Sequence, residues 1–194
     1  DNSSRDFDWL DTMWRRTLIS SNSERMIGKL FSISVNIPAF LERFPDAKLL
    51  YMIREPLNVI PSGLSLVTGV LDSVFGFWDL PEKKRQFYIN RLYNALIELQ
   101  LRFHEDWVNG RIDKEKVMIV KYDSMMSNFE GLINDVLEFI EHEPSQDFLD
   151  QVSKMAEKQR NYKSKHKYDL KKFGLTEEKI RKDCAKIYET FFNE

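Results

Sequence analysis

Residues 48–66 read KLLYMIREPLNVIPSGLSL and join an apolar run to a polar motif. The run 48–53 is almost continuously apolar, as expected for a strand buried on both faces of a parallel sheet. Arg54 follows this strand directly, and the Glu55-Pro56 step ends it. A fixed positive charge is therefore predicted at the carboxyl end of a buried strand.

Arg54 and Ser62 are predicted to lie together beyond this strand. In parallel sheets, ligands bind outside the carboxyl ends of strands, where loops lead into helix N-termini. We expect Asn58 to cap the following helix, so that Pro61 lies in its first turn and Ser62 joins the free amides. These groups would bind a phosphate or sulfate. The residues alone leave open an alternative in which Arg54 pairs with a nearby carboxylate and Ser62 is an ordinary helical residue.

Strand-like and helix-like segments alternate along the chain. The patterns predict helices over 1–24, 36–44, 81–109, 128–142, 145–160 and 176–191, strands over 25–33, 48–53 and 117–122, and a loop over 68–80. The expected N-caps are Asn36, Ser127 (in a capping box with Glu130) and Thr176. This alternation predicts a helix-rich α/β fold with three layers, in which helices flank a parallel sheet.

Length and composition narrow the class of protein. The 194 residues fit one domain, 1–194, with residues 1–24 as a helical lead-in and 161–194 as a basic segment followed by a terminal helix. Apolar residues make up 42% of the chain, so a folded core is expected. The net charge of −2 argues against general nucleic-acid or membrane-surface binding. The sequence contains no apolar run of about 18 residues, so no membrane span is predicted.

The residues that commonly bind metals are widely spaced. His104 and His142 are expected at the surface near helix ends, and Cys184 is expected in the core on a helical apolar face. No metal site is therefore predicted. A single cysteine also excludes an internal disulfide.

Three blocks of the sequence resemble the sulfotransferase superfamily. Residues 44–66, FPDAKLLYMIREPLNVIPSGLSL, resemble its central block, in which a strand ends in Arg-x-Pro and a helix with a serine follows. Residues 117–143 resemble the later strand and helix, with a tyrosine-acid pair after the strand. Residues 162–180, YKSKHKYDLKKFGLTEEKI, resemble the C-terminal run of one subgroup. The resemblance covers most of residues 25–190 and implies a P-loop NTPase-like sulfotransferase fold.

The resemblance also implies an activity and a binding site. Members transfer a sulfuryl group from 3′-phosphoadenosine 5′-phosphosulfate (PAPS) to an acceptor hydroxyl or amine and release 3′-phosphoadenosine 5′-phosphate (PAP). Arg54 and Ser62 would hold the 3′-phosphate, with Glu55 where many members have Asp. The basic segment would cover the donor nucleotide, where four residues would contact the 3′-phosphate or line the acceptor entrance: Lys163, Ser164, Lys165 and His166.

Two family features are missing or altered. The Gly/Ser/Thr loop that wraps the 5′-phosphosulfate has no counterpart among the seven glycines. We therefore interpret the chain as the C-terminal part of a larger sulfotransferase domain, incomplete at its N-terminus and inactive by itself if that loop is required. Some members carry Lys-x-His before the arginine strand. Here the matching run is Lys29-Leu30-Phe31, in which Lys29 would stabilise the leaving oxygen but Phe31 cannot act as a base.

The remaining features leave alternatives open. Phe75, Phe77 and Trp78 are candidates for an acceptor-site wall or for a hydrophobic cover over the core. Apart from the enzyme, a non-catalytic nucleotide-binding or scaffold module is the main alternative, and a basic RNA-binding module ranks last. The acceptor would be a small molecule, glycan or protein, with no nucleic-acid partner. A cytoplasmic location is favoured over the Golgi, which would require an anchor upstream.

Overall fold

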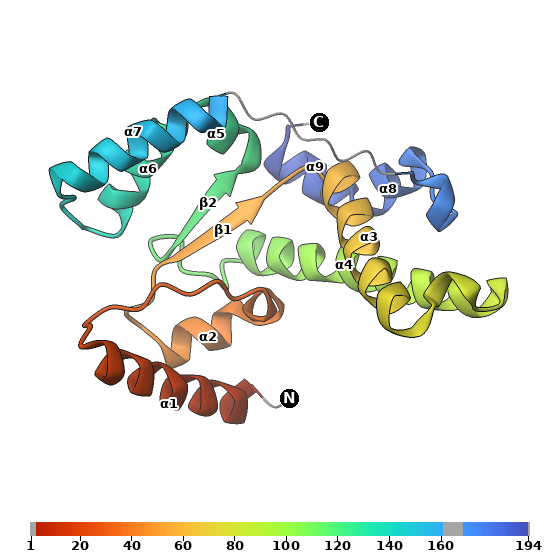
Figure 1. Cartoon of the computed structure of the whole chain (residues 1–194), viewed down its shortest axis with the longest axis horizontal. Coiled ribbons are helices and arrows are strands. Elements are labelled where there is room, and N and C mark those ends of the chain that lie inside the picture. The colour runs from red at the N-terminus through yellow and green to blue at the C-terminus, as the bar shows by residue number, and fades with distance from the viewer. Residues whose placement is uncertain (1–2, 161–168, 194) are drawn as a thin grey trace.

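The computed structural model describes residues 3–160 and 169–193 (Figure 1). Helices predominate along this part of the chain, and two short strands lie between them. The elements are α1 (Ser3–Ser21), η1 (Ser32–Val35), α2 (Ile37–Arg43), β1 (Leu49–Ile53), α3 (Pro56–Phe75), η2 (Phe77–Asp79), α4 (Glu82–Val108), β2 (Val117–Lys121), α5 (Tyr122–Ser127), α6 (Phe129–Phe139), α7 (Gln146–Arg160), η3 (Lys171–Phe173), α8 (Glu177–Asp183) and α9 (Ala185–Phe191).

The two strands form a parallel pair, with Leu49 opposite Val117 and Ile53 opposite Lys121. This confirms the predicted helix-rich α/β fold with a parallel sheet. Figure 1 shows α3, α4, α8 and α9 gathered on the side toward which the strands run, with α6 and α7 beside the sheet. The strands therefore point their carboxyl ends at a group of packed helices.

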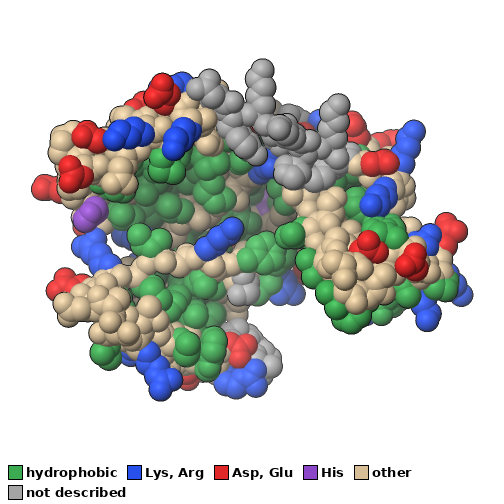
Figure 2. All heavy atoms as spheres, in the orientation of Figure 1, with side chains coloured by type: hydrophobic (Ala, Val, Ile, Leu, Met, Phe, Trp, Pro, Cys, Tyr) green, Lys and Arg blue, Asp and Glu red, His purple; other side chains and the backbone are tan. Residues whose placement is uncertain are grey.

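The first strand is less buried than its apolar sequence predicts. The Tyr51 ring stacks on Phe103 of α4 with the ring centres 3.4 Å apart, so this face of the sheet is covered. On the other face, Leu50 and Met52 are exposed, and hydrophobic side chains gather beside α6 and α7 in Figure 2. Burial of β1 on both faces was therefore a wrong prediction for the described part of the chain, because α4 packs against one face only.

The strand predicted over 25–33 is also wrong. The structure has an irregular connection there, followed by η1. Ile27 is 97% exposed and Phe31 is 72% exposed, so these apolar side chains are not used for packing. A strand needs a hydrogen-bonded neighbour, and within the described residues only β1 and β2 pair.

Two of the four predicted N-caps, Asn36 and Thr176, are confirmed. The side chains of Asn36 and Thr176 each accept the amide hydrogen three residues further on, at 3.4 and 3.2 Å. Ser127 is not a cap, because an additional helix, α5, ends there and its hydroxyl donates to a backbone carbonyl within that helix. Asn128 caps α6 instead and accepts from the amide of Gly131 at 3.1 Å.

The helix α3 extends to Phe75 and so covers more than half of the predicted loop 68–80. It ends at Gly76, whose left-handed backbone (φ 62°) forms the C-cap. Near its centre, a Cβ on Gly63 would come within 2.9 Å of Leu96, so this glycine permits close packing of α3 on α4. By length and mean hydropathy (1.3), α3 could also cross a membrane, and 22% of that stretch is buried. The absence of a membrane span therefore stays a prediction.

The core joins α4 to the C-terminal helices. Cys184 is fully buried, as predicted. His104 is buried too, which corrects its expected surface position: its Nε2 lies 2.8 Å from the Thr190 hydroxyl of the helix segment that covers it. Burial lowers the pKa of His104, since the interior disfavours the charged imidazole.

Asp183 connects α4 with α8. Its Oδ2 accepts the Tyr93 hydroxyl at 2.8 Å and the Lys179 ammonium at 2.7 Å. The hydrogen bond from Lys179 lowers the pKa of Asp183, against the opposing effect of burial. A carboxyl with a lowered pKa stabilises the fold above its unfolded-state pKa, and this stabilisation fades as the pH falls through its folded-state pKa.

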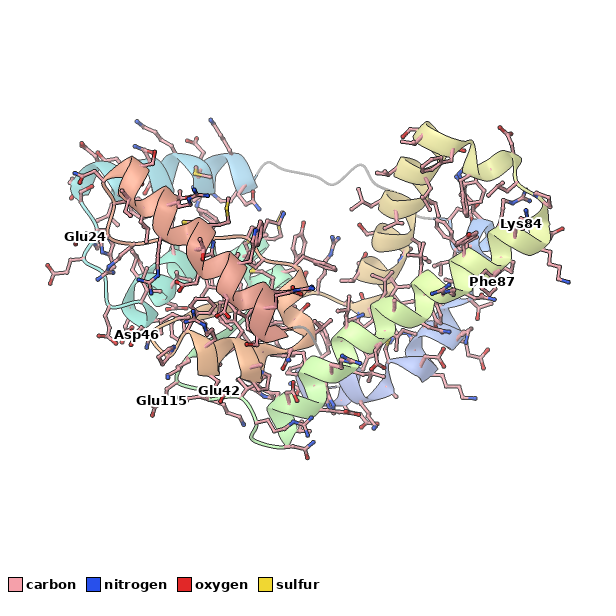
Figure 3. The ribbon with its side chains drawn as sticks, turned by 90° about the horizontal axis from the view of Figure 1, so that it is seen from below. Glu24, Glu42, Asp46, Lys84, Phe87 and Glu115 are labelled. Carbon is pink, nitrogen blue, oxygen red and sulfur yellow. The ribbon has the colours of Figure 1, made fainter. Side chains whose placement is uncertain are left out.

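We expect Asp183→Asn to lower the free energy of unfolding by about 1 kcal/mol at pH 7, because it weakens charge-assisted bonds at a partly exposed site. The difference from the wild type should shrink as the pH falls below about 4. Urea unfolding at several pH values measures both effects. Asp46→Asn is the control, since this labelled side chain is exposed at the surface in Figure 3. A deficit that stayed constant down to pH 3 would assign the effect to packing.

Candidate anion site at the carboxyl ends of the strands

The register of the sheet brings Arg54 and Tyr122 together. Ile53 is opposite Lys121 at the ends of β1 and β2. The residues that follow them, Arg54 and Tyr122, therefore lie side by side. The Arg54 Cζ atom is 4.2 Å from the centre of the Tyr122 ring. This distance is well within the range of a cation–π contact. The candidate site is therefore centred on an arginine that stacks on an aromatic ring at the carboxyl edge of the sheet.

Arg54 is partly buried, but no carboxylate of the described residues lies within 4.0 Å of its guanidinium. The neighbouring acid, Glu55, interacts elsewhere. Its carboxylate is 3.4 Å from the Arg181 guanidinium and accepts the Asn58 side-chain amide at 3.1 Å. Over the described part of the chain, the alternative in which Arg54 pairs with a nearby acid is therefore not supported.

The start of α3 differs from the prediction. The helix begins at Pro56 with Glu55 as its N-cap, so Asn58 lies inside the first turn. Proline suits the first helical position, because its φ is already helical and no intrahelical bond is lost there. The amides of Asn58 and Val59 both donate to the Glu55 carbonyl, at 2.9 and 3.1 Å. The free helical amides expected around an anion are thus already engaged.

The earlier start moves Pro61 and Ser62 into the second turn. Pro61 is now inside the helix, where its missing N–H removes the bond that the Leu57 carbonyl would otherwise accept. Ser62 follows it and is partly buried. Its predicted contribution to the anion site therefore depends on its hydroxyl and not on the first-turn amides.

Two residues that the sequence interpretation did not single out hold the turn between β1 and α3. The Tyr188 hydroxyl donates to the Glu55 carboxylate at 3.4 Å, and Arg181 contacts the same oxygen. Burial raises the pKa of Tyr188 to about 12, and the nearby Glu55 charge adds to this, although a hydrogen bond with the Leu57 backbone lowers it. The acid at position 55 indicated that a contact of this kind was possible. Its partners Arg181 and Tyr188 could not be identified from the sequence, because they lie more than 120 residues away.

The three aromatic candidates do not form one wall. Phe77 is 2% exposed and packs in the core, which agrees with the alternative of a cover over the core and corrects its assignment to an acceptor site. Phe75 is 74% exposed at the end of α3. Trp78 is partly buried, with the Lys172 ammonium 4.2 Å from its ring centre. An acceptor role for Phe75 and Trp78 stays a prediction.

The other predicted site residues are placed only in part. Lys29 is exposed in the irregular connection before η1, and not at a strand end. The basic residues Lys163, Ser164, Lys165 and His166 lie outside the described residues. Within the described ranges, no three His, Cys, Asp or Glu side chains come together as metal ligands would, and a metal-free site stays a prediction.

Two hollows of the molecular surface lie at places other than Arg54. A hollow of about 650 Å³ is lined by part of α1 and by Leu30, Ile33, Val35 and Asn36. Another, of about 450 Å³, lies beside β2 and includes Trp107 and Phe191 in its lining. Over the described part of the chain, neither of these two hollows is lined by Arg54 or Ser62.

The family model described as "Sulfotransferase family" matches residues 5–147. The chain therefore belongs to the sulfotransferase family. Among solved structures, the sulfotransferase STF9 from Mycobacterium avium matches with a TM-score of 0.67 and 22% sequence identity. The match covers 84% of this chain and 41% of the STF9 chain, so it shows a shared fold over less than half of that enzyme. A comparison with curated protein sequences finds no match.

Proposed function

We propose that this chain provides the 3′-phosphate-binding part of a sulfotransferase that uses PAPS as its donor. The observation that carries this proposal is Arg54, which lies at the carboxyl edge of the sheet, stacks on Tyr122 and has no carboxylate partner in the described part of the chain. A guanidinium in this position can donate two parallel hydrogen bonds to a phosphate. Family membership indicates the chemistry that such a site would serve.

The reaction proposed is an in-line transfer. The acceptor oxygen or nitrogen gives up its proton to solvent water and forms a bond to sulfur, while the bond between sulfur and the 5′-phosphate oxygen breaks and PAP leaves. Catalysis of this kind depends mainly on positioning and on stabilisation of charge. Arg54, assisted by the Ser62 hydroxyl, would hold the nucleotide by its 3′-phosphate and thereby set the position of the reacting sulfur. Lys29 is the candidate residue for stabilising the negative charge that develops on the leaving oxygen.

Nucleotide discrimination tests the donor assignment. PAP at a concentration 100 times its Kd should stabilise the protein by about 2.7 kcal/mol. For a chain of this size, that is a rise in Tm of roughly 5–10 °C. Adenosine 5′-phosphate, which lacks the 3′-phosphate, should give a much smaller shift. Differential scanning fluorimetry over a range of ligand concentrations measures both.

Equal stabilisation by the two nucleotides would contradict the 3′-phosphate site. Salt-dependent RNA binding without any nucleotide effect would favour the RNA-binding alternative. PAP binding without sulfuryl transfer, measured with the longer protein if the chain is part of one, would favour the non-catalytic module.

A further inference from the structure

We propose that Tyr122 is a positioning residue for Arg54. In this proposal, which rests on the 3′-phosphate site above, the ring supports the guanidinium face so that its N–H edge is directed at the phosphate. The contact is short, with Cζ 4.2 Å from the ring centre. A flat guanidinium that stacks on an aromatic face keeps its hydrogen-bond donors in the plane, free for another partner.

The ring is well placed for this role because the sheet determines its position. Tyr122 is the residue after β2 and the first residue of α5, so its backbone is held by a strand on one side and a helix on the other. Arg54 occupies the corresponding position after β1. The next residue, Glu55, is held by Arg181 and Tyr188 from the C-terminal helices. Both partners of the stack therefore directly follow hydrogen-bonded strands, and the side chain next to Arg54 is held by the C-terminal helices.

Stacking also reduces the entropic cost of binding. An arginine side chain has many rotamers and loses this freedom when it is ordered. If Tyr122 orders it before the ligand arrives, less of this cost remains for the binding step. The Tyr122 hydroxyl has no hydrogen-bond partner within the described residues, so the contact that matters here is the ring. The conservative change to phenylalanine should therefore retain the function.

A double-mutant cycle with PAP as the probe tests this inference. Tyr122→Leu keeps an apolar side chain but removes the ring, and we expect it to weaken PAP binding about tenfold, because the unsupported arginine must then be ordered by the ligand. Tyr122→Phe should stay within about twofold of the wild type. In an Arg54→Ala background, Tyr122→Leu should cause no further loss. Titration calorimetry gives the affinities, and urea unfolding identifies any variant that fails to fold.

The outcomes separate this inference from the proposed function. Losses that add fully in the double variant, or a Tyr122→Leu loss that is as large for adenosine 5′-phosphate as for PAP, would mean that Tyr122 acts on the nucleotide or on the fold and would overturn the positioning role. Normal PAP affinity in Tyr122→Leu, with a large loss in Arg54→Ala, would also overturn it but leave the 3′-phosphate site intact. If neither variant changes PAP affinity, the 3′-phosphate site itself is wrong, and the positioning role is wrong with it.

Discussion

Replacement of Arg54 with alanine is expected to weaken PAP binding by about 100-fold. The guanidinium can donate two hydrogen bonds to a phosphate, and hydrogen bonds to charged groups contribute about 1.5–3 kcal/mol each. Loss of both would correspond to a factor of about 100 or more. Among the described residues, no second cation lies over the Tyr122 ring that could take the place of Arg54. Titration calorimetry with PAP measures the loss directly.

The effect should be specific to this position and to binding. Arg54 is partly exposed and unpaired with acids in the described part of the chain, so the free energy of unfolding should fall by no more than about 1 kcal/mol, the size of the cation–π contact with Tyr122 that is lost. Arg54→Lys should recover part of the affinity, because it restores the charge but not the two-pronged geometry. Arg102→Ala is the matched control, since Arg102 is an exposed arginine on α4 that pairs with Glu98. The proposed site is wrong if Arg54→Ala and Arg102→Ala bind PAP equally well.

The largest effect on stability is expected from Phe103→Ala, which should lower the free energy of unfolding by roughly 3–5 kcal/mol. Phe103 is fully buried on α4. Its ring lies between Tyr51 of β1, at 3.4 Å, and Phe191 of α9, at 5.9 Å between ring centres. Removal of this ring would open a cavity where the sheet, the long helix and the C-terminal helix meet. Urea unfolding monitored by circular dichroism measures the loss.

Two further variants establish that burial is the cause. Phe103→Leu fills most of the same space and should cost clearly less than the change to alanine. Phe87 is on the same helix but is 57% exposed, and its labelled side chain lies at the outer end of α4 in Figure 3. Phe87→Ala should therefore cost less than about 1 kcal/mol. A Phe103→Ala loss no larger than that of Phe87→Ala would show that this aromatic stack does not hold the sheet on α4.

Local patterns in the sequence predicted much of the fold and part of the site. The helical period of residues 81–109 and the apolar runs at 48–53 and 117–122 correspond to α4, β1 and β2. The caps at Asn36 and Thr176 were predictable because each depends on an amide only three residues away. The position of Arg54 at the carboxyl end of a strand was predictable for the same reason, because Arg54 directly follows the apolar run 48–53.

Errors arose where the outcome depended on distant parts of the chain. Residues 25–33 have a strand-like composition, but they have no strand neighbour in the described structure. His104 was expected near the surface, yet it is buried because α9, far along the chain, covers it. The start of α3 was placed too late, since Pro56 and the Glu55 carbonyl together begin the helix before Asn58.

The sequence by itself determined the class of fold, the two strands and the arginine at the end of the first, because apolar runs and capping act over a few residues. Only the tertiary structure decided what surrounds that arginine. The register of β1 and β2 places the Tyr122 ring on its guanidinium, and α8 and α9 bring Arg181 and Tyr188 to the adjacent acid. These contacts join residues 68 to 133 positions apart, and such pairings depend on how the elements pack and not on any local pattern.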